Sequence, residues 1–117
     1  MTEAKRGEIY MADADPVVGH EQGGTRPFLL LSINQMNRSP AQLIIAVPLT
    51  TTDRGSDLHA RLEPPEGGLH RISFAMPEMV RVLSTARLRK RLGRASPDTV
   101  EAVANRVGIL IGLGRNR

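Results

Sequence analysis

Arg26 and Thr50 are the two residues whose types and positions best suit chemistry on a phosphate group. Arg26 precedes Pro27, which biases its backbone towards an extended conformation at the mouth of a strand. A guanidinium fixed there can bind a phosphate through two parallel hydrogen bonds and offset the charge that builds on it. Thr50 lies where an aliphatic run ends, and its hydroxyl can donate to a non-bridging phosphate oxygen. The alternatives are an arginine in solvent and a threonine that completes a turn.

The composition limits the fold and the chemistry. The chain has 117 residues, room for one compact domain over residues 1–117, and no cysteine, which excludes disulfides and thiolate zinc sites. Only one Tyr, two Phe and no Trp are present, so the core must be aliphatic. No apolar run approaches the roughly 18 residues of a membrane span, and the N-terminus lacks an apolar signal region. We therefore expect a cytoplasmic protein.

Short apolar runs alternate with residues that favour turns, which is typical of a mainly β domain. The runs are Glu8–Asp13, Phe28–Ile33, Leu43–Val47, Leu58–Leu62, Ile72–Met76 and Met79–Leu83. Ser96 then predicts a helix N-cap, with Pro97 in the first turn and Asp98 beside the positive end of the helix dipole. The helix should bury one apolar stripe made of Val100, Val103, Val107, Leu110 and Ile111. The sequence thus predicts an α+β, mainly β fold: a small curled sheet with one terminal helix, and flexible tails at 1–6 and 113–117.

The positive charge is concentrated in one segment. The net charge is +4 and the sequence pI is about 10.6, which by itself favours a polyanionic partner only weakly. The basic segment contains Arg87, Arg89, Lys90, Arg91 and Arg94. As a strand, Arg87–Leu92 would turn its arginines to one side and its leucines to the other. Such a stripe is either a solvated edge that blunts strand pairing or a contact with a phosphate backbone.

Three stretches carry a resemblance to a known family. They are Arg6–Tyr10 followed by Gly19–Pro27, then Val47–Thr51, then Gly68-Leu69, Ser73 and Glu78–Arg81. In this order and spacing the chain resembles the MazF/PemK (Kid) toxins over almost its whole length. The resemblance implies an SH3-like barrel of the CcdB/PemK type, a homodimer, and a metal-independent endoribonuclease that needs no cofactor. It also implies selective cleavage of single-stranded RNA (mRNA, tRNA or rRNA), inhibition of translation and growth, and a cognate antitoxin, which could be the partner of the basic segment.

The resemblance extends to the candidate catalytic residues. Arg26 and Thr50 match active-site positions, and Glu21 is the carboxylate that could take or relay the proton of the ribose 2′-OH; such a base contributes about 10²- to 10⁴-fold. Glu78 matches a catalytic aspartate of PemK-type members, but Met76 stands where those members carry an arginine. This departure favours the set of Glu21, Arg26 and Thr50. Because a guanidinium with a pKa above about 12 rarely releases its proton, Arg26 is better suited to stabilising the phosphorane.

Further residues are expected to contact RNA, and two other functions stay open. The predicted RNA contacts are Gln22, Thr51, Ser73, Arg81, Arg87 and Arg89. The loops Val17–Thr25 and Thr51–Asp57 should set the recognised sequence. One alternative is a non-catalytic SH3-like RNA-binding module. The other is a gyrase poison of the CcdB kind, which acts through a C-terminal Trp that this chain lacks.

Overall fold

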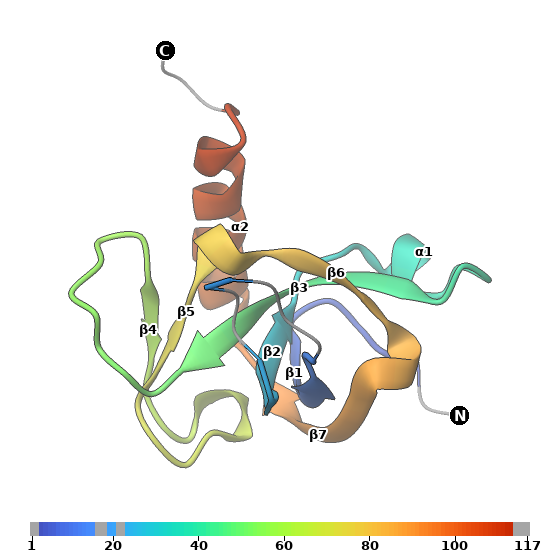
Figure 1. Cartoon of the computed structure of the whole chain (residues 1–117), viewed down its shortest axis with the longest axis horizontal. Helices are drawn as coiled ribbons and strands as arrows, with labels where there is room; N and C mark the ends of the chain where they lie inside the picture. The colour runs from blue at the N-terminus through green and yellow to red at the C-terminus, as the bar shows by residue number, and fades with distance from the viewer. Residues whose placement is uncertain (1–2, 16–18, 21–22, 114–117) are drawn as a thin grey trace.

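The computed structural model describes residues 3–15, 19–20 and 23–113. In these ranges, antiparallel pairing joins seven strands in the order β4-β5-β3-β2-β1-β7, with β6 also paired to β3. The strands are β1 (Glu8–Asp13), β2 (Thr25–Leu30), β3 (Leu43–Thr50), β4 (Ala60–Leu62), β5 (Ser73–Ala75), β6 (Arg81–Ser84) and β7 (Leu88–Arg94). The helices are α1 (Asn34–Asn37) and α2 (Pro97–Leu110), and the 3₁₀ turns are η1 (Glu66–Gly68), η2 (Pro77–Met79) and η3 (Thr85–Arg87). Figure 1 shows this arrangement.

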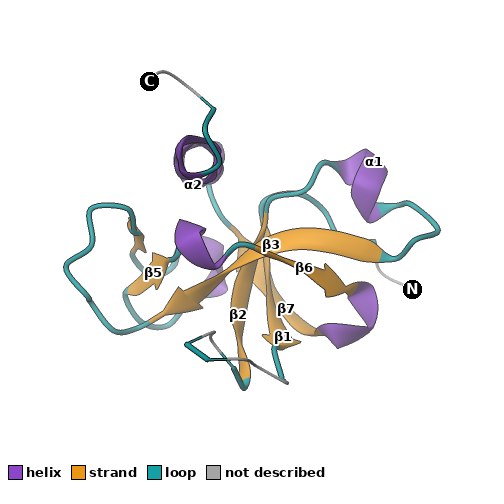
Figure 2. Cartoon of the chain, turned by 45° about the horizontal axis from the view of Figure 1, so that its top comes forward, coloured by secondary structure: helices purple, strands orange, loops and turns teal. Residues whose placement is uncertain are grey.

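Strand β3 is the centre of the sheet. One of its edges pairs with β2, while the other pairs with β6 over Leu43–Ala46 and with β5 at Leu49–Thr50. Because two strands share one edge of β3, the sheet divides there, and β6, β3, β2, β1 and β7 curl around one another (Figure 2). The end of β3 therefore lies where the curled sheet meets the β4–β5 pair.

Successive side chains of the central strands alternate between two apolar clusters, as the two faces of a strand require. The cluster under α2 is mainly aliphatic and includes Ile9, Leu29, Val47, Leu49, Leu62, Val100 and Val103. The cluster inside the curl includes Tyr10, Phe28, Leu30, Ile44, Ala46 and Leu83. Both faces of β1–β3 are thus buried, which explains why their sequences read as nearly continuous apolar runs.

The predicted architecture, a mainly antiparallel curled sheet with a C-terminal helix, is confirmed. The start of α2 also has the expected cap: Ser96 Oγ accepts a hydrogen bond of 3.2 Å from the Thr99 backbone N–H, and Pro97 occupies the first turn. In the described ranges, no helix has both the length and the apolar character needed to cross a membrane.

The end of α2 corrects one prediction. Leu110 and Ile111, placed on the buried stripe by their periodicity, are 44% and 68% exposed. Only Val100 and Val103 are fully packed, because the last turns of α2 extend away from the sheet (Figure 1). The helix therefore ends in an exposed apolar tip.

The beginning of the described chain makes specific contacts with the sheet. Ala4 is buried, and Arg6 Nε donates to the Leu31 carbonyl oxygen at 2.9 Å. Ala4 and Arg6 thus pack against the sheet, and Ala4 belongs to the cluster inside the curl.

The turn η1 packs directly on β7. Gly68 has a φ of +73°, and a Cβ at this position would overlap the Leu92 carbonyl oxygen. A Cβ on Gly93 would lie only 2.6 Å from the backbone of Gly67. Glycines are required at this contact because two backbones touch without side chains between them.

Candidate active site

Arg26 and Thr50 lie opposite each other at the ends of two adjacent strands. Antiparallel pairing of β2 with β3 matches Phe28 with Pro48, and continuing that register by two residues places Arg26 opposite Thr50. Arg26 Nη1 also lies 3.4 Å from the carbonyl oxygen of Leu49. The structure therefore brings together the two residues that the sequence singles out for phosphate chemistry.

The Arg26 side chain is held by the main chain. Its Nε donates to the Gly23 carbonyl oxygen at 3.0 Å, and its Nη1 donates to Leu49. Burial lowers the pKa of Arg26 from its ordinary value, and the nearby charge of Arg54 lowers it further. An anion beside this guanidinium would offset both effects.

The hydroxyl of Thr50 takes part in a turn and can also donate a hydrogen bond to a ligand. The residue is 8% exposed, and its Oγ1 accepts a 3.2 Å hydrogen bond from the Thr52 backbone N–H. Because the oxygen is the acceptor there, the hydroxyl proton is left to donate to another group. The turn interpretation and the phosphate interpretation of Thr50 are thus compatible.

These groups line a cleft of about 360 Å³ at the junction of β2, β3 and β5. Its lining residues are Thr25, Arg26, Pro27, Leu49, Thr50, Thr51, Thr52, Arg54 and Ser73. Among the described residues, this set contains two arginines and no carboxylate, so the described lining has an excess of positive charge. Hydroxyls surround the arginines, which gives a site rich in hydrogen-bond donors for an anion.

Two of the predicted RNA contacts line this cleft and two predicted residues lie outside the described ranges. Thr51 is exposed at its rim, and Ser73 is buried with its Oγ donating to the Arg71 carbonyl oxygen at 3.0 Å. Glu21 and Gln22 lie outside the described residues.

Arg54 is the main lining residue that the sequence reasoning missed. The available signal is its place in the polar loop that follows Thr50, since that loop is expected to contact RNA. Thr25 and Thr52 were also missed and supply further hydroxyls to the cleft.

Glu78 lies apart from the cleft. It belongs to η2, and its Oε2 is 2.8 Å from Nε2 of His59, whose side chain is only 4% exposed. The pair joins the start of β4 to η2, and Glu78 is not among the residues that line the cleft. This position favours a structural role for Glu78 over proton transfer beside Arg26.

Arg81, Arg87 and Arg89 bind the chain where β1 ends. Arg81 Nη1 donates to the Ala14 carbonyl oxygen at 3.2 Å, and Arg87 Nη1 donates to the carbonyl oxygens of Asp13, at 3.1 Å, and Asp15. Arg89 Nη2 lies 3.7 Å from Asp13 Oδ2. None of the three lines the cleft, and together they hold the base of the loop that leads to Arg26.

The rest of the basic segment is partly neutralised by β1. Arg91 Nε contacts Glu8 Oε2 at 2.7 Å, and Arg94 Nη2 lies 3.9 Å from the same oxygen. The cause is the strand order, since β7 pairs with β1 and so runs beside its acidic residues. Of the two interpretations of the basic segment, these contacts favour a structural one.

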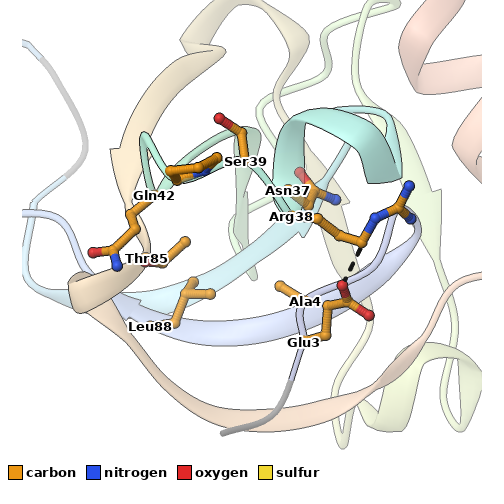
Figure 3. Close-up of a pocket in the computed structure, with 9 residues that line it drawn as sticks. Glu3, Ala4, Asn37, Arg38, Ser39, Gln42, Thr85 and Leu88 are labelled. Atoms are coloured by element: carbon orange, nitrogen blue, oxygen red, sulfur yellow. Dashed lines mark ion pairs between the residues drawn. The ribbon is translucent and has the colours of Figure 1, made fainter.

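A larger cavity, of about 490 Å³, lies near α1 (Figure 3). It is lined by Glu3, Ala4, Asn37, Arg38, Ser39, Pro40, Gln42, Thr85 and Leu88. Arg38, the one cation among its described lining residues, has its Nε 3.9 Å from Oε2 of Glu3, so these two charges compensate each other. The smaller cleft is therefore the better site for a phosphate.

Residues 3–15, 19–20 and 23–113 contain no group of three or more His, Asp or Glu side chains that could hold a metal ion. The donors of the cleft are instead arginine and hydroxyl groups.

Comparison with known protein families identifies the family to which the chain belongs. Residues 5–111 match the model of the PemK-like, MazF-like toxins of type II toxin–antitoxin systems. The chain belongs to this toxin family. All nine residues that line the cleft fall inside the matched range.

Individual relatives of this toxin-family chain agree in sequence and in structure. A protein of Staphylococcus saprophyticus named endoribonuclease MazF is 31% identical over 110 residues, which cover 93% of this chain and 92% of that protein. The crystal structure of MazF from Deinococcus radiodurans matches 97% of this chain and 100% of its own, with a TM-score of 0.87 and 27% identity. A MazE–MazF structure from the same organism matches with a TM-score of 0.80, 27% identity and the same coverage.

Proposed function

We propose that this toxin-family chain is an endoribonuclease that cleaves single-stranded RNA at short specific sequences. The observation that carries the proposal is the position of Arg26 opposite Thr50 in a cleft whose described lining residues include two arginines and no carboxylate. The endoribonuclease name of the relative that is 31% identical supports RNA as the substrate.

The proposed reaction is a transesterification within one nucleotide of the RNA. The 2′-oxygen bonds to the adjacent phosphorus and the bond from phosphorus to the 5′-oxygen breaks, giving a 2′,3′-cyclic phosphate and a 5′-hydroxyl end. Glu21 takes or relays the 2′-OH proton, and the departing 5′-oxygen gains a proton. No metal ion enters this sequence of steps.

Arg26 and Thr50 stabilise the charge that develops in this reaction. The phosphorane carries one more negative charge than the starting phosphodiester, so donors fixed in advance bind it more strongly than they bind the substrate. The Arg26 guanidinium is oriented by Gly23 and Leu49, and the Thr50 hydroxyl has its proton free to donate. Both therefore act on the non-bridging oxygens.

The cellular role that follows is that of a cytoplasmic toxin. Cleavage of mRNA would inhibit translation and growth, and a cognate antitoxin would neutralise the activity. The related MazE–MazF structure supports an antitoxin partner. A homodimer is part of the proposal, supported by exposed apolar residues in the last turn of α2 and just after it, which include Ile109 (62% exposed) and Leu113 (65% exposed). Light scattering should then give twice the chain mass of 12.8 kDa.

The experiment compares Thr50→Val with Thr50→Ser on a labelled RNA in EDTA. Loss of a hydrogen bond to a charged group is worth about 1.5–3 kcal/mol, so Thr50→Val should lower kcat by roughly 10- to 150-fold. Thr50→Ser should retain most of the activity because it keeps the hydroxyl. Thr85→Val, which removes a hydroxyl from the larger cavity, is the matched control.

The products test the chemistry separately. A single 2′-deoxynucleotide at the cut site should abolish cleavage there, and the upstream fragment should carry a cyclic phosphate. RNA binding without fragments would instead support a non-catalytic binding module, and inhibition of gyrase supercoiling would support a CcdB-like poison. Primer extension on a long RNA would define the recognised sequence.

A further inference from the structure

Arg54 offers a second cation to the same cleft, and the proposed function assigns it no role. We propose that Arg54 binds the RNA phosphate next to the scissile one, so that the cleft holds two consecutive phosphates. The inference rests on the proposed function for its substrate, single-stranded RNA, and adds a residue that positions the RNA strand in the cleft.

The loop after β3 brings Arg54 back to the cleft. The Thr52 backbone N–H binds Thr50 Oγ1, and the Gly55 backbone N–H binds Asp53 Oδ1 at 2.9 Å. Gly55 has a φ of +69°, which a glycine adopts without strain. These local turns explain how a residue four positions beyond Thr50 lines the same cleft.

The charge of Arg54 is uncompensated in the described structure. Its side chain is exposed, forms no ion pair with another described residue, and has no carboxylate beside it among the lining residues. The Asp53 carboxylate accepts the hydrogen bond from Gly55 and does not line the cleft. Arg54 also lowers the pKa of Arg26, as a nearby like charge does. Two cations that share one cleft and form no ion pair with a described residue fit an anion with more than one negative charge.

The two arginines differ in a way that assigns them to different phosphates. Arg26 is half-buried, and two main-chain hydrogen bonds fix it opposite Thr50, as a group at the reacting phosphorus requires. Arg54 is exposed on a loop and makes no such bond to another described residue. Each phosphodiester of RNA carries one negative charge, so a strand across the cleft supplies one phosphate to each cation. Arg54 thus contributes to binding and register, and Arg26 to the chemical step.

This division makes a specific prediction for Arg54→Gln. The variant should raise the dissociation constant of a non-cleavable RNA by about 2- to 5-fold near physiological salt and leave kcat at saturating RNA within about twofold. The slope of log affinity against log salt should fall by about 0.7, the value for one phosphate contact of a single strand. Arg38→Gln, which removes an exposed arginine at the end of α1 that does not line the cleft, should change neither quantity.

The decisive experiment neutralises single phosphates of the RNA. Oligonucleotides with a 2′-deoxynucleotide at the cut site, which blocks cleavage, carry one methylphosphonate at each linkage in turn. At one linkage beside the scissile one, the neutral group should weaken binding to the wild-type protein and leave binding to Arg54→Gln unchanged. If wild type and variant respond equally at every flanking linkage, the inference is wrong. It is also wrong if Arg54→Gln lowers kcat as strongly as Arg26→Ala.

Failure of this inference is distinguishable from failure of the nuclease proposal. If the wild-type protein cuts RNA and Arg54→Gln binds and cuts equally well, only the role of Arg54 is overturned. If the wild-type protein binds the blocked RNA through Arg54 but never cuts its cleavable counterpart, the phosphate site stands and the nuclease is overturned.

Discussion

Replacing Arg26 with lysine tests whether the geometry of the guanidinium, beyond its charge, drives cleavage. The Arg26 side chain binds the carbonyl oxygens of Gly23 and Leu49 and keeps further N–H groups for the phosphate. A lysine ammonium cannot reach two carbonyls and a phosphate in one planar arrangement. Loss of one fixed donor to a developing oxyanion lowers kcat by about 10²- to 10³-fold, or about 2.7–4 kcal/mol. We expect Arg26→Lys near the lower value and Arg26→Ala, which also loses the charge, at or beyond the upper one.

The same substitutions should leave the protein folded. Arg26→Ala removes two main-chain hydrogen bonds, each worth about 0.5–1.5 kcal/mol, but at this half-buried position water can replace part of them. Relief of the repulsion with Arg54 offsets some of the remainder. A net loss of about 1 kcal/mol would lower the melting temperature by roughly 3–6 °C.

The assay measures kcat with a fluorescent RNA at saturating concentration in EDTA, together with thermal unfolding by circular dichroism. Arg38→Ala is the control for loss of an exposed arginine outside the cleft. Arg26→Lys within about threefold of wild type would show that a point charge suffices. Wild-type cleavage by folded Arg26→Ala would falsify the assignment of Arg26 to the reaction.

Three further predictions concern residues outside the cleft. Arg89→Gln should change RNA affinity by less than about twofold in filter binding, because Arg89 faces Asp13; a larger loss would restore the basic segment as an RNA contact. Burial raises the pKa of Tyr10, so the unfolded chain releases this proton at a lower pH than the folded chain, and the free energy of unfolding falls above about pH 10. Urea unfolding at pH 9 and pH 11 should show a smaller alkaline loss of stability in Tyr10→Phe than in the wild type. An equal loss in both proteins would contradict this. Gly68→Ala should destabilise by about 3 kcal/mol or more in thermal melts, because a left-handed backbone and an overlap with Leu92 both oppose it; an unchanged melt would show that η1 can move away from β7.

The local parts of the fold could be predicted from the sequence because short-range signals determine them. The cap at Ser96 and the apolar runs of β1–β3 each depend on neighbouring residues, and both are present as expected. The exposed end of α2 could not be predicted in this way. Periodicity identifies which side of a helix is apolar, but the length of sheet beneath the helix decides how many turns are buried.

The basic segment shows a second limit of sequence reasoning. Its charge is evident in the sequence, whereas its partners depend on which strand lies beside it. Because β7 pairs with β1, Glu8 and Asp13 reach Arg91 and Arg89 across more than seventy residues of chain. Charge pattern alone cannot separate a surface that binds a polyanion from one that binds the protein's own carboxylates.

The candidate site depends on local residue types, which the sequence shows, and on strand pairing, which only the structure shows. Arg26 and Thr50 could be named from their types and from the family resemblance, but their proximity follows from the register of β2 with β3. Arg54 could not be named, since its position depends on the two tight turns after Thr50. A loop residue of this kind is located only when the backbone hydrogen bonds of the loop are known.

The arginines differ in how far their charges are already compensated within the protein, and this difference indicates where an anionic ligand would bind. Arg91 is paired with a buried carboxylate, and Arg87 binds main-chain carbonyls, so a polyanion would have to compete with contacts that already exist. Arg26 and Arg54 instead share a cleft whose described lining residues include no carboxylate; burial lowers the pKa of Arg26, and repulsion by the charge of Arg54 lowers it further. Because a phosphate relieves that repulsion, the cleft gains more from an anion than the more highly charged strand does. The phosphorane carries an additional negative charge and therefore interacts with the two arginines more strongly than the phosphodiester does. This stronger interaction in the transition state is what catalysis requires.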